Sequence, residues 1–295
     1  MKDKRILLVP KLTKVEWDMK RLNLTEQELV KFYEKEGLNL ERIFSSHKKQ
    51  KESLEIIKKL LSRADHIDRD SLNKENISDY DIVISFGGDN HFQFVSHFIY
   101  DKPVLGINSD PERSEGALTN VSTGEFGKIY ETLLRDNFEI KEWTRLKVEI
   151  DDKEINELAI SEIFIGEKER FNMSRHIIKF NGGVEEQKGS GLLISTGAGS
   201  SGWYNSASRY LFPDGNSFPK TSREARFILT EPYRGRLSPL NLINGRIKEN
   251  EEIEIISLSD SSPFISIDSL KLIKLREGAR IKIRIGKPLR VIKLK

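Results

Sequence analysis

The stretch Asp81-Ile-Val-Ile-Ser-Phe86, followed by Gly87-Gly88-Asp89-Asn90, decides how the first part of this chain folds. Its short, continuous apolar run is typical of a strand that is covered on both faces of a parallel sheet. The glycines end the strand, and residues His91–Ile99 have a helical pattern. Since open α/β sheets bind ligands beyond the carboxyl ends of their strands, this turn is the first candidate site.

The sequence around this stretch repeats the alternation of strand and helix. Ile6–Pro10 and Pro103–Ile107 are further buried strands, and a long charged helical stretch runs from about Thr25 to Leu61. This β–α–β order predicts a doubly wound α/β domain over residues 1–107, with 275–295 as a candidate completion.

The pattern changes after Asn108, where short strand-like runs are separated by turn residues. We therefore expect a β-rich, antiparallel and sandwich-like domain over residues 108–274, with a helix at Thr123–Arg135 between the two parts. The predicted strands are Lys147–Ile150, Ile160–Ile165, His176–Phe180, Leu192–Ser195, Ile253–Ile256, Phe264–Ile267 and Ile281–Ile285.

Composition excludes several classes of protein. The 295 residues contain no cysteine, which rules out disulfide scaffolds, cysteine-ligated metals and thiol nucleophiles, and fits a reducing compartment. The net charge of +3 does not indicate a nucleic-acid binder. No apolar stretch approaches the ~18 residues of a membrane span, and the apolar run at the N-terminus is too short for a signal peptide. We expect a soluble, cytoplasmic protein that binds neither nucleic acid nor membrane.

The turn at Gly87–Asn90 suits an anionic ligand, because paired glycines let backbone N–H groups approach phosphate oxygens at a helix N-terminus. Asp89 would repel a phosphate, so its charge fits a group that accepts a hydroxyl proton or holds a cation. An equally open interpretation is a plain strand–turn–helix with Asp89 as the helix cap. The chain has no G-x-x-x-x-G-K-[ST] motif and is not a P-loop NTPase.

A second glycine loop, Gly197-Ala198-Gly199-Ser200-Ser201-Gly202, matches G-x-G-x-x-G literally. It lacks the early β–α–β context of a dehydrogenase, which stays a minor alternative. Trp203 and Tyr204 follow the loop and fit either stacking on a base or burial. The five histidines have no metal-binding spacing, and no G-x-S-x-G motif supports a serine hydrolase.

Four strings then point to one family. Ser109-Asp110-Pro111-Glu112-Arg113-Ser114-Glu115-Gly116 follows a Gly-x-Asn strand end, and Ser161-Glu162-Ile163-Phe164-Ile165-Gly166-Glu167 comes later. Lys188-Gly189-Ser190-Gly191-Leu192 and Thr196-Gly197-Ala198-Gly199-Ser200-Ser201-Gly202-Trp203 complete the set. With the glycine turn, these strings resemble the NAD kinase family, most of all its mitochondrial type.

The resemblance implies a two-domain enzyme that transfers the γ-phosphoryl group of ATP to the 2′-hydroxyl of the adenosine ribose of NAD. It implies Asp89 as the catalytic base, Mg²⁺ or another divalent cation with ATP, and a homodimer. The implied NAD-binding residues are Gly88, Asp89, Asn90, Ser161, Glu162, Ser190, Ser201, Trp203 and Ser206. Those implied for ATP and its phosphates are Gly87, Gly88, His91, Asn108, Arg113 and Lys188, and no metal ligand is assigned.

This chain departs from the family pattern at several of these positions. The G-D-G-T of the family is here Gly88-Asp89-Asn90-His91, its N-E is Ser161-Glu162, and its D-G-Q is Asp268-Ser269-Leu270. The side chain of Asn90 stands where backbone is expected to approach the ligand, although Asn tolerates left-handed backbone better than most residues. The alternative is therefore a homologue that binds a dinucleotide without catalysis or phosphorylates another nucleoside-like alcohol.

Overall fold

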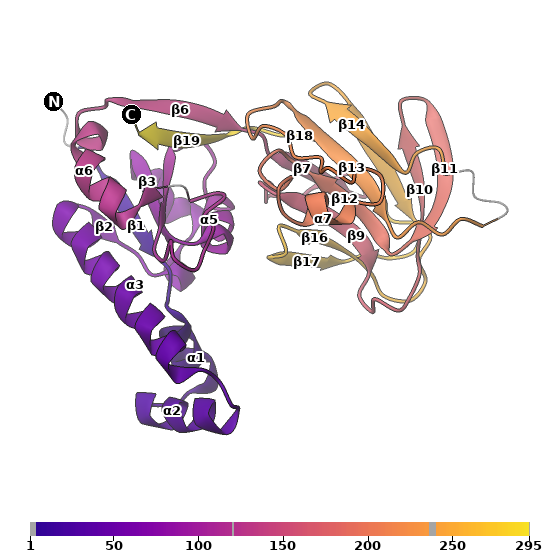
Figure 1. Cartoon of the computed structure of the whole chain (residues 1–295). Coiled ribbons are helices and arrows are strands. Elements are labelled where there is room, and N and C mark those ends of the chain that lie inside the picture. The colour runs from indigo at the N-terminus through magenta and orange to yellow at the C-terminus, as the bar shows by residue number, and fades with distance from the viewer. Residues whose placement is uncertain (1–3, 120, 236–239, 295) are drawn as a thin grey trace. The chain divides into compact units, whose positions relative to one another are not determined.

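The computed structural model describes residues 4–119, 121–235 and 240–294, which form two compact units (Figure 1). The first unit extends to Ile140 and includes the chain again from Val291, whereas the second comprises Lys141–Arg290. The predicted fold class is confirmed, because an α/β unit with parallel strands is followed by a unit of antiparallel sheets.

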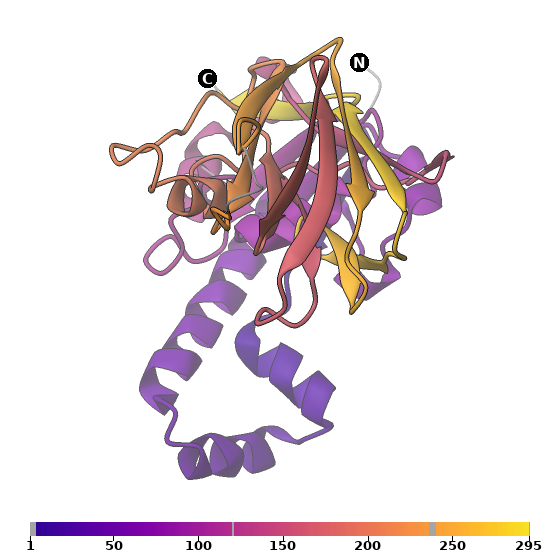
Figure 2. The same cartoon turned by 90° about the vertical axis from the view of Figure 1, so that its right-hand side faces the viewer.

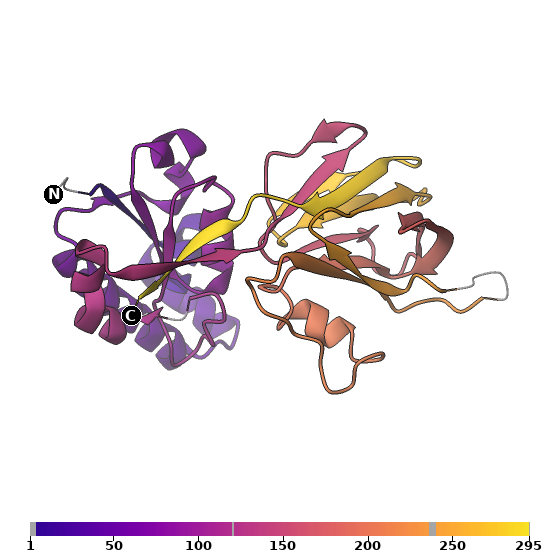
Figure 3. The same cartoon turned by 90° about the horizontal axis from the view of Figure 1, so that it is seen from above.

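The first unit is built on one sheet, whose strand order over the described ranges is β2-β1-β3-β4-β19-β6, with β5 paired to β4. All the pairings of β1, β3 and β4 with their registered partners are parallel. The strands are β1 (Ile6–Pro10), β2 (Asp65–His66), β3 (Ile82–Gly87), β4 (Val104–Asn108), β5 (Val121–Ser122), β6 (Phe138–Trp143) and β19 (Leu289–Leu294). Figure 3 shows β19, in yellow, among the strands of this unit.

Helices connect the three predicted strands β1, β3 and β4 along the chain, and a further helix follows β4. They are α1 (Lys14–Leu22), α2 (Glu26–Lys35), α3 (Leu40–Leu60), the short 3₁₀ helix η1 (Arg69–Ser71), α4 (Lys74–Ser78), α5 (Asp89–Ser96) and α6 (Thr123–Leu134). Apolar side chains of α3 and α6, such as Ile57 and Phe126, share one buried cluster with Ile84 and Ile107 of the sheet. Burial against the sheet therefore fixes these helices.

The unit boundary differs from the predicted one at 107–108. Residues 108–140 belong to the first unit, because Phe126 and Leu133 of α6 are buried with Leu105 and Ile107 of β4. Residues 275–295 were expected to complete the first domain, but only the residues from Val291 onward belong to the first unit.

The charged stretch from Thr25 to Leu61 is two helices, α2 and α3, where a single helical stretch was expected. Between them Gly37 has φ +65°, a left-handed conformation that ends a helix at low cost. The side chain of Asn39 then accepts a hydrogen bond from the backbone N–H of Arg42 and starts α3. In Figure 2 the helices near the N-terminus lie one after another in indigo and violet.

The second unit is a sandwich of two antiparallel sheets. Over the described residues one has the order β11-β10-β15-β18-β7-β8 and the other β14-β13-β12-β9-β16-β17. The first contains β7 (Leu146–Ile150), β8 (Lys153–Glu154), β10 (Ser174–Phe180), β11 (Gly183–Gly189), β15 (Glu252–Ser257) and β18 (Arg280–Ile285). The second contains β9 (Glu162–Glu167), β12 (Gly191–Ser195), β13 (Glu224–Thr230), β14 (Asn244–Lys248), β16 (Pro263–Ile267) and β17 (Lys271–Lys274), and a short helix, α7 (Trp203–Ala207), follows β12.

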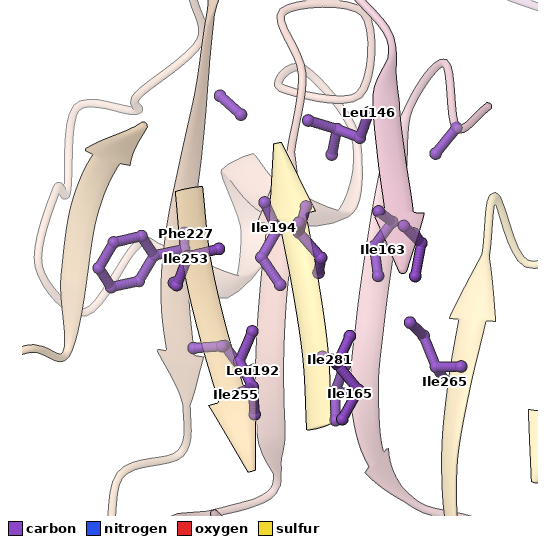
Figure 4. Packing of buried hydrophobic residues seen from close by; sticks show 14 of the residues in the cluster. Leu146, Ile163, Ile165, Leu192, Ile194, Phe227, Ile253, Ile255, Ile265 and Ile281 are labelled. Carbon is purple, nitrogen blue, oxygen red and sulfur yellow. The ribbon is translucent and has the colours of Figure 1, made fainter. Parts of the chain in front are cut away.

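Side chains from both sheets form the core of this unit. Figure 4 shows Ile163, Ile194 and Ile265 of one sheet packed with Ile255 and Ile281 of the other. All five are at most 1% exposed, which accounts for the alternating apolar pattern of their strands. Among the described residues, no helix combines the length and apolar character needed to cross a membrane.

The turn between β16 and β17 yields a test of backbone strain. Asp268 and Ser269 have φ values of 50° and 54°, and left-handed backbone is unfavourable for a residue with a Cβ. We expect Ser269→Gly to stabilise the protein by about 0.5 kcal/mol, because the relief of strain exceeds the added chain entropy of glycine. Urea unfolding would measure the gain. Ser261→Gly, at an exposed position without positive φ, is the control, and an equal gain there would refute the explanation.

Candidate functional site

The glycine turn lies at the carboxyl end of β3, where Gly88 is the N-cap of α5 and Asp89 its first residue. A Cβ at Gly87 would lie 2.8 Å from the ring of His91 and 2.9 Å from Cβ of Lys11, so only glycine fits there. The first amides of α5 have no acceptor within the helix and carry its partial positive charge. The turn therefore offers backbone donors at an edge of the parallel sheet.

Asp89 holds the loop that follows β4. Its Oδ1 accepts hydrogen bonds from the backbone N–H groups of Leu118 (2.8 Å) and Thr119 (3.2 Å), and from the Thr119 hydroxyl (3.3 Å). Its Oδ2 accepts one, from the N–H of Ala117 (2.9 Å). Oδ2 accepts one hydrogen bond whereas Oδ1 accepts three, so Oδ2 is the oxygen that can accept a further donor.

His91 has a different role from the predicted phosphate contact. Its side chain is 1% exposed, and Nε2 lies 2.9 Å from the carbonyl oxygen of Val9, which places the ring hydrogen on Nε2. Burial lowers the pKa of His91 to about 4, so the ring is neutral at physiological pH. The histidine thus packs against β1 and Gly87, and this corrects its assignment as a phosphate ligand.

Asn90 is exposed in the first turn of α5, and its φ is not positive. The left-handed backbone that a glycine would favour at this position is therefore not adopted, and Asn replaces it without backbone strain. The side chain of Asn90 borders the same turn as Asp89, so its predicted place in an NAD site stays a prediction.

Asn108 and Arg113 brace the loop after β4. Asn108 is 4% exposed, donates to the carbonyl of Ser114 (3.0 Å) and accepts from the N–H of Asp110 (3.0 Å). Arg113 is exposed and lies 3.4 Å from the hydroxyl of Ser45 and 3.9 Å from the carboxylate of Asp110. The structure thus brings Gly87, Gly88, Asp89, Asn90, Asn108 and Arg113 into one turn-and-loop region of the first unit.

In the second unit Asp268 holds the start of β9. Its carboxylate accepts the backbone N–H groups of Ile160, Ser161 and Glu162 at 2.8, 2.8 and 3.0 Å, and its own N–H donates to the carbonyl of Glu162 (2.9 Å). Asp268 is 1% exposed and lies in the hairpin turn after β16. The Ser-Glu string therefore has a fixed backbone.

Glu162 is the titratable group of this region. Burial, and secondarily the negative charge of Asp268, raises the pKa of Glu162 to about 8. A carboxyl group with such a pKa changes its protonation near neutral pH. Glu162 is therefore a candidate for contacts with ligand hydroxyls whose strength depends on pH.

The second glycine loop packs against the same backbone. A Cβ at Gly199 would lie 2.4 Å from the carbonyl oxygen of Ser161, and one at Gly197 would lie 2.0 Å from that of Pro219. Close packing thus explains these glycines. Because the preceding strand, β12, pairs antiparallel with both of its neighbours, the loop is not a dinucleotide fingerprint of the dehydrogenase type.

Trp203 and Tyr204 separate into two roles. Tyr204 is 1% exposed and belongs to a buried cluster with Leu193 and Ile228. Trp203 is 37% exposed, and its ring centroid lies 4.9 Å from that of Phe164 with planes tilted by 35°. Trp203 thus has the exposure that a stacking residue needs. The predicted Ser201 and Ser206 are also exposed on this loop and helix.

Lys188 and Ser190 lie where β11 passes into β12. The carbonyl of Lys188 accepts the N–H of Tyr233 (2.8 Å), and the hydroxyl of Ser190 donates to the carboxylate of Glu231, which Arg170 also contacts at 3.2 Å. Glu231 was not predicted, because it directly follows β13 (Glu224–Thr230), a strand that the sequence did not reveal, and no local motif marks it.

Asp268 and Thr119 were likewise absent from the predicted site residues. For Asp268 the available signal was the Asp-Ser pair between two apolar runs, which is typical of a hairpin turn. No local pattern singled out Thr119, because its contact with Asp89 joins residues 30 apart. In the part of the chain that the structure describes, no group of three or more His, Asp or Glu side chains is placed to hold a metal ion.

Comparisons with known proteins are consistent with one family, although no family model matches the chain. The "Probable NADH kinase" of Oryza sativa subsp. japonica is 25% identical over 265 residues, covering 81% of this chain and 79% of its own. The mitochondrial NAD kinase 2 of Rattus norvegicus is 27% identical over 250 residues, covering 68% of this chain but only 59% of its own length. The NAD kinase 2 of Halalkalibacterium halodurans is 26% identical over 265 residues, covering 87% and 93%.

The fold agrees with a solved structure. An NAD kinase from Archaeoglobus fulgidus, crystallised in complex with ATP, superposes with a TM-score of 0.68 at 18% identity, over 98% of this chain and 93% of that one. At this identity the likeness to the solved structure establishes the fold alone, and the named relatives show which proteins the sequence resembles. In sequence and in fold, the chain is similar to proteins named NAD kinase.

Proposed function

We propose that this protein is an NAD kinase, which transfers the γ-phosphoryl group of ATP to the 2′-hydroxyl of the adenosine ribose of NAD. The observation that carries the proposal is the turn Gly87-Gly88-Asp89, with a carboxylate among backbone donors at the carboxyl end of β3. The names of the relatives in both sequence and structure comparisons support it.

The proposed reaction needs a proton acceptor beside a phosphate site. A bond forms between the ribose 2′-oxygen and the γ-phosphorus, the bond from that phosphorus to the β,γ-bridging oxygen breaks, and ADP leaves. The hydroxyl proton passes to Oδ2 of Asp89, the oxygen with an acceptor site to spare. The hydrogen bonds to Oδ1 hold the carboxylate in place during this transfer.

The second unit carries side chains whose chemistry suits binding of NAD. Ionised Glu162 accepts hydrogen bonds from ribose hydroxyls, and the exposed ring of Trp203 stacks on a base. Ser190, Ser201 and Ser206 offer neutral hydroxyl contacts, and Lys188 offers a positive charge to phosphate. Ser161 is 2% exposed and its N–H donates to Asp268, so its contact with NAD stays a prediction.

A divalent cation, Mg²⁺ by preference, accompanies ATP in the proposed reaction and shields the charge of its phosphates. Such ions commonly use one or two protein carboxylates together with substrate phosphates. A cation held mainly by substrate phosphates needs few protein ligands, which fits described residues that include no group of three or more His, Asp or Glu placed to hold a metal.

We also propose a homodimer in the cytoplasm. The family resemblance supports the dimer, and the absence of cysteine is compatible with a reducing compartment. Sedimentation analysis of the purified chain tests the oligomeric state.

Replacing the base tests the proposal directly. Pure protein with ATP, Mg²⁺ and NAD should form NADP, and Asp89→Asn should lower kcat at least ~100-fold, because the amide cannot accept the proton. An NADP-specific dehydrogenase assay measures both rates. NADH is tested in parallel, since one relative is named a probable NADH kinase.

Because Asp89 also holds a loop, a matched control separates chemistry from structure. Thr119→Val removes the 3.3 Å hydroxyl contact with Asp89 but keeps the carboxylate, and should change kcat by no more than about fivefold. Equal losses in the two variants, or loss of the folded state in Asp89→Asn, would argue against the role as base. NAD binding without any NADP would favour the non-catalytic alternative.

The raised pKa of Glu162 predicts pH-dependent NAD binding. The free enzyme holds the Glu162 proton up to about pH 8, so the ionised acceptor becomes available only as pH rises. The Kd for NAD, measured by calorimetry without ATP, should fall by about three- to tenfold from pH 6.5 to pH 8. Glu162→Gln should bind more weakly with a flat profile. A wild-type Kd that does not vary over this range would contradict the prediction.

A further inference from the structure

Lys11 lies beside the glycine turn although it is far from it in sequence. It directly follows β1, and its backbone N–H donates to the carbonyl of Phe86 (2.8 Å), which continues the parallel ladder between β1 and β3. Its Cβ is 2.9 Å from where a Cβ of Gly87 would lie. The lysine side chain therefore starts from the same sheet edge as the turn.

The ammonium group of Lys11 forms no ion pair with the described residues, unlike those of two neighbouring lysines. A pocket of about 140 Å³ is lined by the lysines Lys11, Lys51 and Lys58, and also by the carboxylates of Glu16 and Asp68. Lys51 pairs with Glu16 at 2.6 Å, and Lys58 pairs with Glu55 at 3.1 Å. Lys11 has no ion pair or side-chain hydrogen bond with any described residue, and its side chain is exposed.

Arg69 brings a second cation to this edge. It opens η1, after the strand β2 that pairs with β1, and its guanidinium carbon lies 4.0 Å from the ring centroid of Phe94 in α5. This cation–π contact holds the half-buried guanidinium against the helix that begins at Asp89. Arg69 also forms no ion pair with the residues that the structure describes.

The two cations influence each other and the turn. Desolvation, and then the charge of Arg69, lowers the pKa of Lys11, while the carboxylate of Asp110 acts in the opposite direction. Arg69 and Lys11 both disfavour a charged His91. Two positive side chains at the sheet edge where α5 begins create a positive potential that an anion would neutralise.

We propose that Lys11 and Arg69 form a cationic site for the phosphate groups of the phosphoryl donor, a role that rests on the proposed kinase function. A triphosphate suits the site because it carries several charges and can accept hydrogen bonds from backbone amides of the turn and from both side chains. Lys11 contributes a flexible ammonium, and Arg69 contributes a planar guanidinium already oriented by Phe94. Neither residue was among the sequence-predicted phosphate contacts.

Binding of inorganic triphosphate tests the site without requiring catalysis. We expect Lys11→Met and Arg69→Gln each to weaken triphosphate binding by about tenfold or more in calorimetry at low salt. Lys11→Arg should restore binding to within about threefold of wild type. Lys58→Met is the matched control, because that lysine lines the same pocket but is paired with Glu55, and it should bind like wild type.

The kinetic readout is specific for the donor. In the active enzyme Lys11→Met should raise the KM for ATP by about tenfold and leave the Kd for NAD unchanged. The proposal is overturned if wild type does not bind triphosphate, if Lys11→Met and Arg69→Gln bind it as wild type does, or if Lys58→Met loses as much. Triphosphate binding that depends on Lys11, without any NADP formation, would retain the anion site and reject the kinase function.

Discussion

In each of the two units, a carboxylate that accepts hydrogen bonds from three consecutive backbone N–H groups fixes the backbone beside the candidate residues of that unit. Asp89 binds the amides of 117–119 in the first unit, and Asp268 binds those of 160–162 in the second. Consecutive amides point in one direction only when the backbone curves around the acceptor, so each aspartate dictates the path of a loop. The residues placed by these loops, among them Glu162, take their positions from that curvature.

Burying a carboxylate is unfavourable unless donors satisfy it, and this restricts which residue can occupy positions 89 and 268. A buried carboxylate such as Asp268, 1% exposed, is tolerated because its acceptors are satisfied by donors that would otherwise be orphaned. An asparagine there would direct an amide N–H₂ at backbone donors, which is unfavourable on both sides. The two aspartates are therefore structural whatever chemistry they perform, and Asp89 combines both roles through its two oxygens.

The sequence predicts those elements whose signal lies in adjacent residues. Continuous apolar runs predicted β1, β3 and β4, and Gly87-Gly88-Asp89 marked the turn before α5. The strand β11 was not predicted, because its buried side chains include the polar residues Glu185 and Gln187. The Gln187 amide donates to the Glu185 carboxylate, which also accepts the N–H of Asn241. Polar residues satisfied by tertiary partners give a strand no apolar signature.

The predicted site shows the same division between local and distant contacts. The glycines of the turn and the Ser161-Glu162 string could be predicted from adjacent residues in the sequence. The burial of His91, which removes it from the phosphate contacts, depends on the carbonyl of Val9, 82 residues away. Lys11 and Arg69 reach the turn only through the pairing of β1 with β2 and β3. The boundary at Ile140 similarly depends on the packing of α6.

The position of β19 between β4 and β6 has a consequence for how the chain is made. The whole second unit lies between β6 and β19 in the sequence, so the first sheet has a gap between β4 and β6 until β19 has been synthesised. During that interval β4 and β6 present unpaired edges, the kind of surface on which nascent chains associate. The sandwich, which is continuous in sequence, can fold before β19 closes the gap, so the α/β unit is completed after the unit that is inserted into it.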